Sequence, residues 1–230
     1  QLAVQQHRSG ADLVALTQQR RRWLGEFGAK PAKRKRSDGR PETVSAASAA
    51  EGPGATKAAF DSRLKQAFGP LAPEALAAYS PATDAEITRK NGELVGDSLF
   101  NYAARHVAAQ VAAAGKPVYR YVFSLDMDGR APMHSDELRY VFGTTHLPGY
   151  TNLPAADDGD KRVSGLMMDA WVNFAKTGAP APAAAWPAAG SSGLPLLQID
   201  DASRPLAAYR DDKLDLIGKL YSRLLAEKQN

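Results

Sequence analysis

The sequence predicts an α/β fold in which helices pack on a few strands, and three observations support this prediction. Phe60, Leu64 and Phe68 recur at helical spacing after Thr56, which is typical of a capped amphipathic helix. Residues 118–125 alternate β-branched and aromatic side chains, which favours a strand. A long helical pattern comes directly before this strand, and a helix followed by a strand is typical of α/β layers.

The other elements follow from apolar spacing and from the glycine and proline residues that end each pattern. Residues 161–177 carry the clearest helical pattern of the chain, and Gly178 ends it. A third helix, which begins at Thr83 or Asp84, carries an apolar stripe on one face. The stripe consists of Val95, Leu99, Tyr102, His106 and Val107. The remaining elements are a helix at 56–68, a short helix at 73–79, strands at 194–199 and 206–209, and a final helix at 214–224.

Composition excludes several classes of protein. The 230 residues are 44% hydrophobic and 23% charged, as expected for a chain with a packed apolar core. There is no cysteine, which excludes disulfides, thiolate metal sites and a cysteine nucleophile. No apolar run approaches the roughly 18 residues of a membrane-spanning helix, so no membrane span is expected.

The positive charge is concentrated at one end of the chain. The first 40 residues contain ten Lys and Arg but three Asp and Glu, although the net charge of the whole chain is only +4. We therefore divide the chain into residues 1–52, a basic, low-complexity segment expected to be disordered or non-native, and residues 53–230. The basic run at 33–36 favours a solvated linker, and a nuclear-localisation or phosphate-contacting patch is the alternative.

Of the four histidines, His134 is the candidate for chemistry. It follows the predicted strand by one loop, and the carboxyl ends of strands are where open α/β sheets place functional groups. An imidazole at such a position can act as a general base near neutral pH. A purely structural histidine is the alternative. His106 is expected in the core, His146 in a loop, and His7 carries no signal.

Several short motifs occur together in a characteristic order. In chain order they are FG (68–69), AYSP (78–81), GDSLF (96–100), PVYRYVF (117–123), HSDELRYVFG (134–143), WVNFAKTG (171–178) and WP (186–187). Together they resemble the C-terminal portion of the type-B carboxylesterases, the α/β-hydrolases that include cholinesterases and bacterial para-nitrobenzyl esterases. The histidine motif is similar to the family pattern H-[GAS]-x-E-[LI]-x-[YF]-V-F-G. The resemblance implies the C-terminal part of an α/β-hydrolase fold, with an incomplete sheet.

The resemblance also implies a serine hydrolase that cleaves carboxylic esters with a Ser–His–Glu triad. His134 lies at the position of the family's catalytic histidine, and the substrate would be a small-molecule ester. Asp97 and Glu137 match positions that support the site without transferring protons; a structural ion pair or helix cap is the alternative for both, and it is the favoured one. Glu51, in SAAEG (48–52), is the candidate for the triad acid, although the family pattern N-x-x-E-G has asparagine where Ser48 stands. A solvated loop glutamate is the alternative for Glu51. No metal or redox cofactor is implied.

Two family features are missing from the 230 residues. The nucleophile elbow G-x-S-x-G does not occur, and neither does the glycine run that contributes the oxyanion hole. We therefore expect a C-terminal portion of a longer enzyme, inactive by itself. The localisation is not predicted, and the resemblance to bacterial relatives offers a secreted or periplasmic full-length protein as one possibility. A catalytically inactive cholinesterase-like binding or adhesion module is the first alternative. A nucleic-acid binder acting through the basic N-terminal run is the second, although nucleic acid is not the expected partner. The oligomeric state is not predicted.

Overall fold

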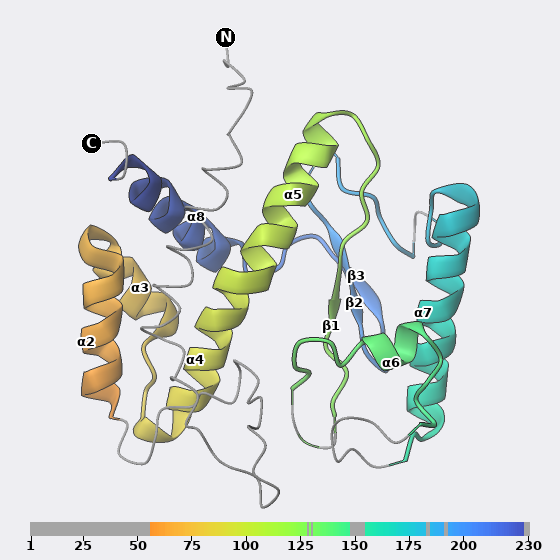
Figure 1. Ribbon diagram of the computed structural model, residues 1–230, viewed down its shortest axis with the longest axis horizontal. Coiled ribbons are helices and arrows are strands. Elements are labelled where there is room, and N and C mark those ends of the chain that lie inside the picture. The colour runs from red at the N-terminus through yellow and green to blue at the C-terminus, as the bar shows by residue number, and fades with distance from the viewer. Residues whose placement is uncertain are drawn as a thin grey trace, which may run out of the picture. The chain divides into compact units, whose positions relative to one another are not determined.

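The computed structural model describes residues 56–127, 129, 131–147, 155–182, 185–190 and 193–227. These residues form two compact units, each with its own core (Figure 1). The first unit contains the described residues up to Tyr102 together with those from Asp212 onward, and the second contains Ala103–Asp211. The predicted N-terminal segment 1–52, with its basic run and Glu51, lies outside the described residues.

The first unit consists of helices that bury their apolar faces against one another. Its elements are α2 (Lys57–Phe68), α3 (Ala72–Tyr79), α4 (Ile87–Gly96) and most of α8 (Asp211–Ala226), with short 3-10 turns at Gly69–Leu71 and Asp84–Glu86. The predicted cap of the first helix is confirmed, because the Thr56 hydroxyl accepts a hydrogen bond of 3.2 Å from the Ala59 amide. Phe60, Leu64 and Phe68 are fully buried, as the helical spacing predicts.

The predicted stripe on the third helix is wrong at its C-terminal end. Between α4 and α5 (Tyr102–Ala113), residues Asp97–Asn101 form a π-helical turn. Such a turn inserts one residue, so the side chains that follow it are rotated by about 100°. His106 and Val107 are exposed rather than buried, whereas Ile87, Asn91, Leu94 and Ser98 form the buried face.

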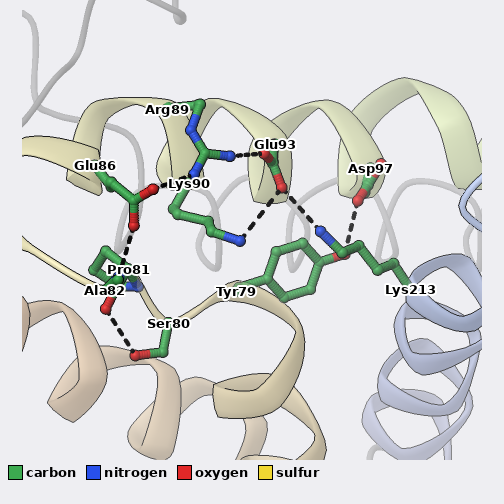
Figure 2. A network of polar contacts seen from close by, with 10 residues as sticks. All are labelled: Tyr79, Ser80, Pro81, Ala82, Glu86, Arg89, Lys90, Glu93, Asp97 and Lys213. Atoms are coloured by element: carbon green, nitrogen blue, oxygen red, sulfur yellow. Dashed lines mark hydrogen bonds and ion pairs between the residues drawn. The ribbon is translucent and has the colours of Figure 1, made fainter.

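A group of polar contacts crosses the first unit, and the fully buried carboxylate of Asp97 lies at one end of it (Figure 2). The Tyr79 hydroxyl donates to Asp97 Oδ2 at 2.8 Å, and the Asn101 amide donates to Asp97 Oδ1 at 2.9 Å. Lys213 of α8 lies over the Tyr79 ring, 5.0 Å from its centroid, and its ammonium is 2.9 Å from Glu93. Tyr79, Glu93 and Lys213 therefore link α3, α4 and α8 next to the buried Asp97 side chain.

The second unit contains a three-stranded mixed sheet. Strand β1 (Tyr121–Phe123) pairs in parallel with β2 (Leu196–Ile199), and β2 pairs antiparallel with β3 (Arg204–Leu206). The predicted strand at 118–125 is present but shorter, with a separate bridge between Val118 and Ala189. The predicted strand at 206–209 is misplaced: the third strand is Arg204–Leu206, because a turn closed by Asp200 and Ser203 ends sooner than the apolar pattern suggests.

Strand β1 has a pairing partner on one side only among the described strands. Leu197 donates its amide to the Arg120 carbonyl, and Ser124 donates to the Ile199 carbonyl, both at 2.9 Å. In a parallel ladder this register directs the amides and carbonyls of Tyr121 and Phe123 to the opposite edge. The sheet is therefore incomplete at β1, as the resemblance implies.

Helix α7 (Asp158–Thr177) covers this sheet together with the short helix α6 (Leu138–Val141) (Figure 1). The predicted helix at 161–177 is confirmed and begins three residues sooner, at a capping box between Asp157 and Asp160. It ends at Gly178, whose φ of 78° is the left-handed conformation that glycine adopts without steric cost. None of the described helices has the length and apolar character to cross a membrane.

We expect that Tyr79→Phe lowers the free energy of unfolding by about 1–3 kcal/mol, because the buried Asp97 carboxylate loses a hydrogen-bond donor. Urea denaturation followed by circular dichroism measures this change. Tyr119→Phe is the matched control: the described residues offer its hydroxyl no hydrogen-bond partner, so the expected change is within about 0.5 kcal/mol. Equal effects of the two variants would contradict the structural role of the network.

Candidate active site

His134 lies in the segment that follows the carboxyl end of β1. After β1 the chain runs through residues 124–133, where Asp126 Oδ1 accepts a hydrogen bond from the Gly129 amide, and then enters a turn at 134–137. The side chain of His134 is exposed. Solvent therefore reaches the side chain of His134, and such access is one requirement of a general base.

The turn that carries His134 is closed from both sides by Met133 and Asp136. The Asp136 amide donates to the Met133 carbonyl at 3.1 Å, and the Met133 amide donates to Asp136 Oδ2 at 2.6 Å. Ser135, between them, has a φ of 76°, a conformation uncommon for residues other than glycine. The positive φ gives a physical reason for the small residue that the family pattern requires after the histidine. The Leu138 amide then bonds the Ser135 carbonyl at 3.2 Å, which joins the turn to α6.

Tyr140 anchors α6 to the start of α7. Its ring is buried, and its hydroxyl donates to Asp160 Oδ1 at 2.6 Å. Burial and the Asp160 carboxylate both raise the pKa of this phenol. The Tyr140 carbonyl accepts from the Ser164 hydroxyl at 2.9 Å, while Asp160 Oδ2 accepts from the Asp157 amide at 3.0 Å. One aspartate therefore serves both the α7 cap and the helix that follows the histidine turn.

Glu137 and Asp97, the two supporting positions implied by the resemblance, lie in different units. Glu137 precedes α6, and its negative charge acts together with burial, the larger cause, to raise the pKa of Tyr121 to about 12. Asp97 accepts hydrogen bonds from Tyr79, as Figure 2 shows, and from Asn101. These contacts give Asp97 a role in stabilising its own unit.

Among the other candidate residues, His146 is exposed in a turn, and Glu51 and His7 lie outside the described residues. The described part of the chain contains no cluster of three or more His, Asp or Glu side chains that could hold a metal ion. Sequence reasoning noted Asp136 only as a neighbour of His134 and did not identify Tyr140 or Asp160. The one available signal was the position of Asp136 and Tyr140 within the HSDELRYVFG motif, whereas Asp160 lies well outside it.

Comparison with solved structures identifies the class of fold. The structure is similar to PNB esterase, with a TM-score of 0.52 and 24% identity over 72% of this chain and 34% of that chain. It is also similar to a carboxylesterase of Geobacillus stearothermophilus, with a TM-score of 0.57 and 24% identity over 70% of this chain and 34% of that chain. The described structure is therefore part of an α/β-hydrolase fold.

Sequence comparison identifies the family. The Carboxylesterase family model matches residues 35–216, and the chain belongs to this family, as the motifs predicted. Carboxylesterase 5A of Felis catus is 35% identical over 111 residues, which are 44% of this chain and 20% of that protein. Fumonisin B1 esterase of Sphingopyxis macrogoltabida is 32% identical over 123 residues, 51% of this chain and 23% of that protein. The chain thus spans about a fifth of the length of these relatives.

We expect Ser135→Gly to raise the free energy of unfolding by about 1 kcal/mol, because glycine adopts the positive φ without a Cβ clash. Ser135→Val is expected to lower it by about 1–2 kcal/mol, because a β-branched residue is strained in this region. Denaturant titration of the three chains measures both changes. The conformation assigned to Ser135 would be contradicted if valine were tolerated as well as glycine.

Proposed function

We propose that this chain supplies the catalytic histidine, His134, of a serine carboxylic-ester hydrolase. The observation that carries the proposal is the placement of an exposed histidine in a closed turn after the carboxyl end of β1. Membership of the carboxylesterase family supports the same role. The proposal includes a small-molecule ester as substrate and an exported, periplasmic or secreted, protein, and both of these rest on the resemblance to the family.

In this mechanism the His134 imidazole takes the proton of a serine hydroxyl as that hydroxyl attacks the ester carbonyl. The same imidazole then gives the proton to the departing alcohol. In the second step it takes a proton from the water that attacks the acyl-enzyme and gives it to the serine oxygen as the acid leaves. A carboxylate orients the imidazole and stabilises its protonated form, and Glu51 is the candidate for that carboxylate. The exposed position of His134 supports this role, because both the hydroxyl and the substrate have to reach the ring.

The serine and the oxyanion donors are the parts of this machinery that the 230 residues do not contain as recognisable motifs. No G-x-S-x-G sequence occurs. The one-sided pairing of β1 among the described strands supports the same conclusion, because a complete hydrolase sheet would continue there. We therefore assign the nucleophile and the oxyanion hole to polypeptide outside these residues.

The 230-residue chain by itself is expected to show no turnover of para-nitrophenyl acetate above the buffer rate, because a general base and its nucleophile act as a unit. Absorbance of released nitrophenolate measures this directly. Turnover that disappears in the His134→Ala chain would show that the nucleophile lies within these residues and would overturn this part of the proposal.

In any longer form of the protein with esterase activity, His134→Ala is expected to lower kcat by at least about 10⁴-fold. His146→Gln is the matched control, because this second exposed histidine belongs to the same unit but lies outside the turn. Its kcat is expected to stay within about twofold. Unchanged activity of the His134→Ala form would contradict the proposed role. A longer form with no esterase activity would favour the non-catalytic binding module.

A further inference from the structure

We propose that Asp136 is a positioning residue that fixes the direction in which the turn presents His134. The inference rests on the proposed role of His134, because a direction matters only if the ring has to meet a reacting hydroxyl. It concerns a residue that the family motif leaves variable, since Asp136 occupies the x in H-[GAS]-x-E. The carboxylate acts on the backbone of the turn and is not offered as the triad acid.

Asp136 contacts the residue on the other side of His134 through two separate hydrogen bonds. Its Oδ2 accepts from the Met133 amide at 2.6 Å, and its own amide donates to the Met133 carbonyl at 3.1 Å. His134 and Ser135 are thereby enclosed between two residues that are linked through both backbone and side chain. A hydrogen bond from a backbone amide to an ionised carboxylate is shorter and stronger than one between neutral groups.

The turn requires such support for two reasons. His134 is exposed, and the backbone of the turn determines the direction of its Cα–Cβ bond. Ser135 has a φ of 76°, which a non-glycine residue keeps only when the surrounding structure holds it. The second bond from Asp136 to Met133 supplies that restraint at the start of the turn, while the Leu138 amide restrains its end through the Ser135 carbonyl.

Glu137, the neighbouring acidic residue, acts in a different direction. It stands at the start of α6, and its charge acts on Tyr121 of β1. Of the two acidic residues, Asp136 is therefore the one whose carboxylate bonds the backbone of the turn. The two acidic residues thus differ: the Asp136 carboxylate bonds the backbone next to the histidine, and the charge of Glu137 acts on Tyr121.

The test uses the full 230-residue chain, isotopically labelled, as Asp136→Ala and Asp136→Asn variants. Asp136→Ala is expected to raise the hydrogen-exchange rate of the Met133 amide by about tenfold, the factor that corresponds to one lost hydrogen bond. The His134 ring signals are expected to shift and to sharpen as the turn loosens. Asp136→Asn is expected to keep both readouts near those of the unmodified chain, because its amide oxygen can still accept from Met133.

Asp126→Ala is the matched control, because Asp126 makes the same kind of carboxylate–amide bond, to Gly129, in the same loop. It is expected to leave the Met133 amide and the His134 ring unchanged. The proposal is overturned if Asp136→Ala leaves both readouts unchanged or if Asp126→Ala changes them equally. Should Asp136→Ala fail to fold, Asp136→Asn decides: a Met133 amide that exchanges at the random-coil rate in this variant overturns the proposal.

In a longer, active form of the protein, Asp136→Ala is expected to lower kcat by about 10²-fold with KM within about twofold, and Asp136→Asn is expected to restore most of kcat. Unchanged kcat in Asp136→Ala would overturn the positioning role. The spectroscopic readouts do not depend on activity. If His134→Ala left activity intact while the Met133 amide behaved as expected, the proposed function would fail and the restraint of the turn by Asp136 would stand.

Discussion

The parallel pairing of β1 with β2 is the constraint on which the candidate site depends. It sets the direction of β1, so that the chain leaves Phe123 at the carboxyl edge of the sheet and reaches His134 in the connection that follows. Parallel neighbours cannot be joined by a hairpin and require a long crossover. That crossover contains the histidine turn, α6 and α7, so the same backbone requirement that closes the sheet also produces the segment that carries the candidate base.

Within the crossover, a small number of polar contacts around Tyr140 and Asp160 join α6 to α7. A phenol buried without an acceptor would be costly, and Asp160 removes that cost while it also completes the cap of α7. Because α6 follows the histidine turn directly, these contacts restrain one end of the turn. Asp136 restrains the other end through Met133. The histidine is therefore exposed, but the backbone on both sides of it is restrained.

The first unit is also stabilised by hydrogen bonds to a carboxylate, but there the carboxylate is buried in the core. Its core buries Asp97, which accepts hydrogen bonds from Tyr79 and Asn101, and Lys213 of α8 lies over the Tyr79 ring. The π-helical turn at Asp97–Asn101 lies at this point and shifts the helical register of the residues that follow it. The GDSLF motif therefore has a structural explanation that does not require contact with the histidine turn. Family motifs thus occur in both units, and each unit is stabilised by its own set of residues.

The sequence by itself determined the helices whose signals are local and the existence of β1, and it made His134 the candidate for chemistry. Thr56 caps α2 and Gly178 ends α7 through bonds within a few residues, so their positions could be predicted from spacing and residue type. The buried face after the π-helical turn, the length of β1 and the start of β3 were predicted incorrectly. Those features depend on hydrogen bonds with distant residues or on an inserted residue that no apolar pattern reveals.

At the candidate site the motif identified which residue to consider, but only the tertiary structure decided how it is held. The sign of φ at Ser135, the return of the Asp136 carboxylate to Met133, and the pairing of Tyr140 with Asp160 are not encoded in the spacing of residue types. The first two require the backbone path of the turn, and the third joins residues twenty positions apart. The sequence therefore indicated which residue is the candidate base, and the tertiary structure decided how its backbone is restrained. The restraint comes from contacts that form only when the chain is folded.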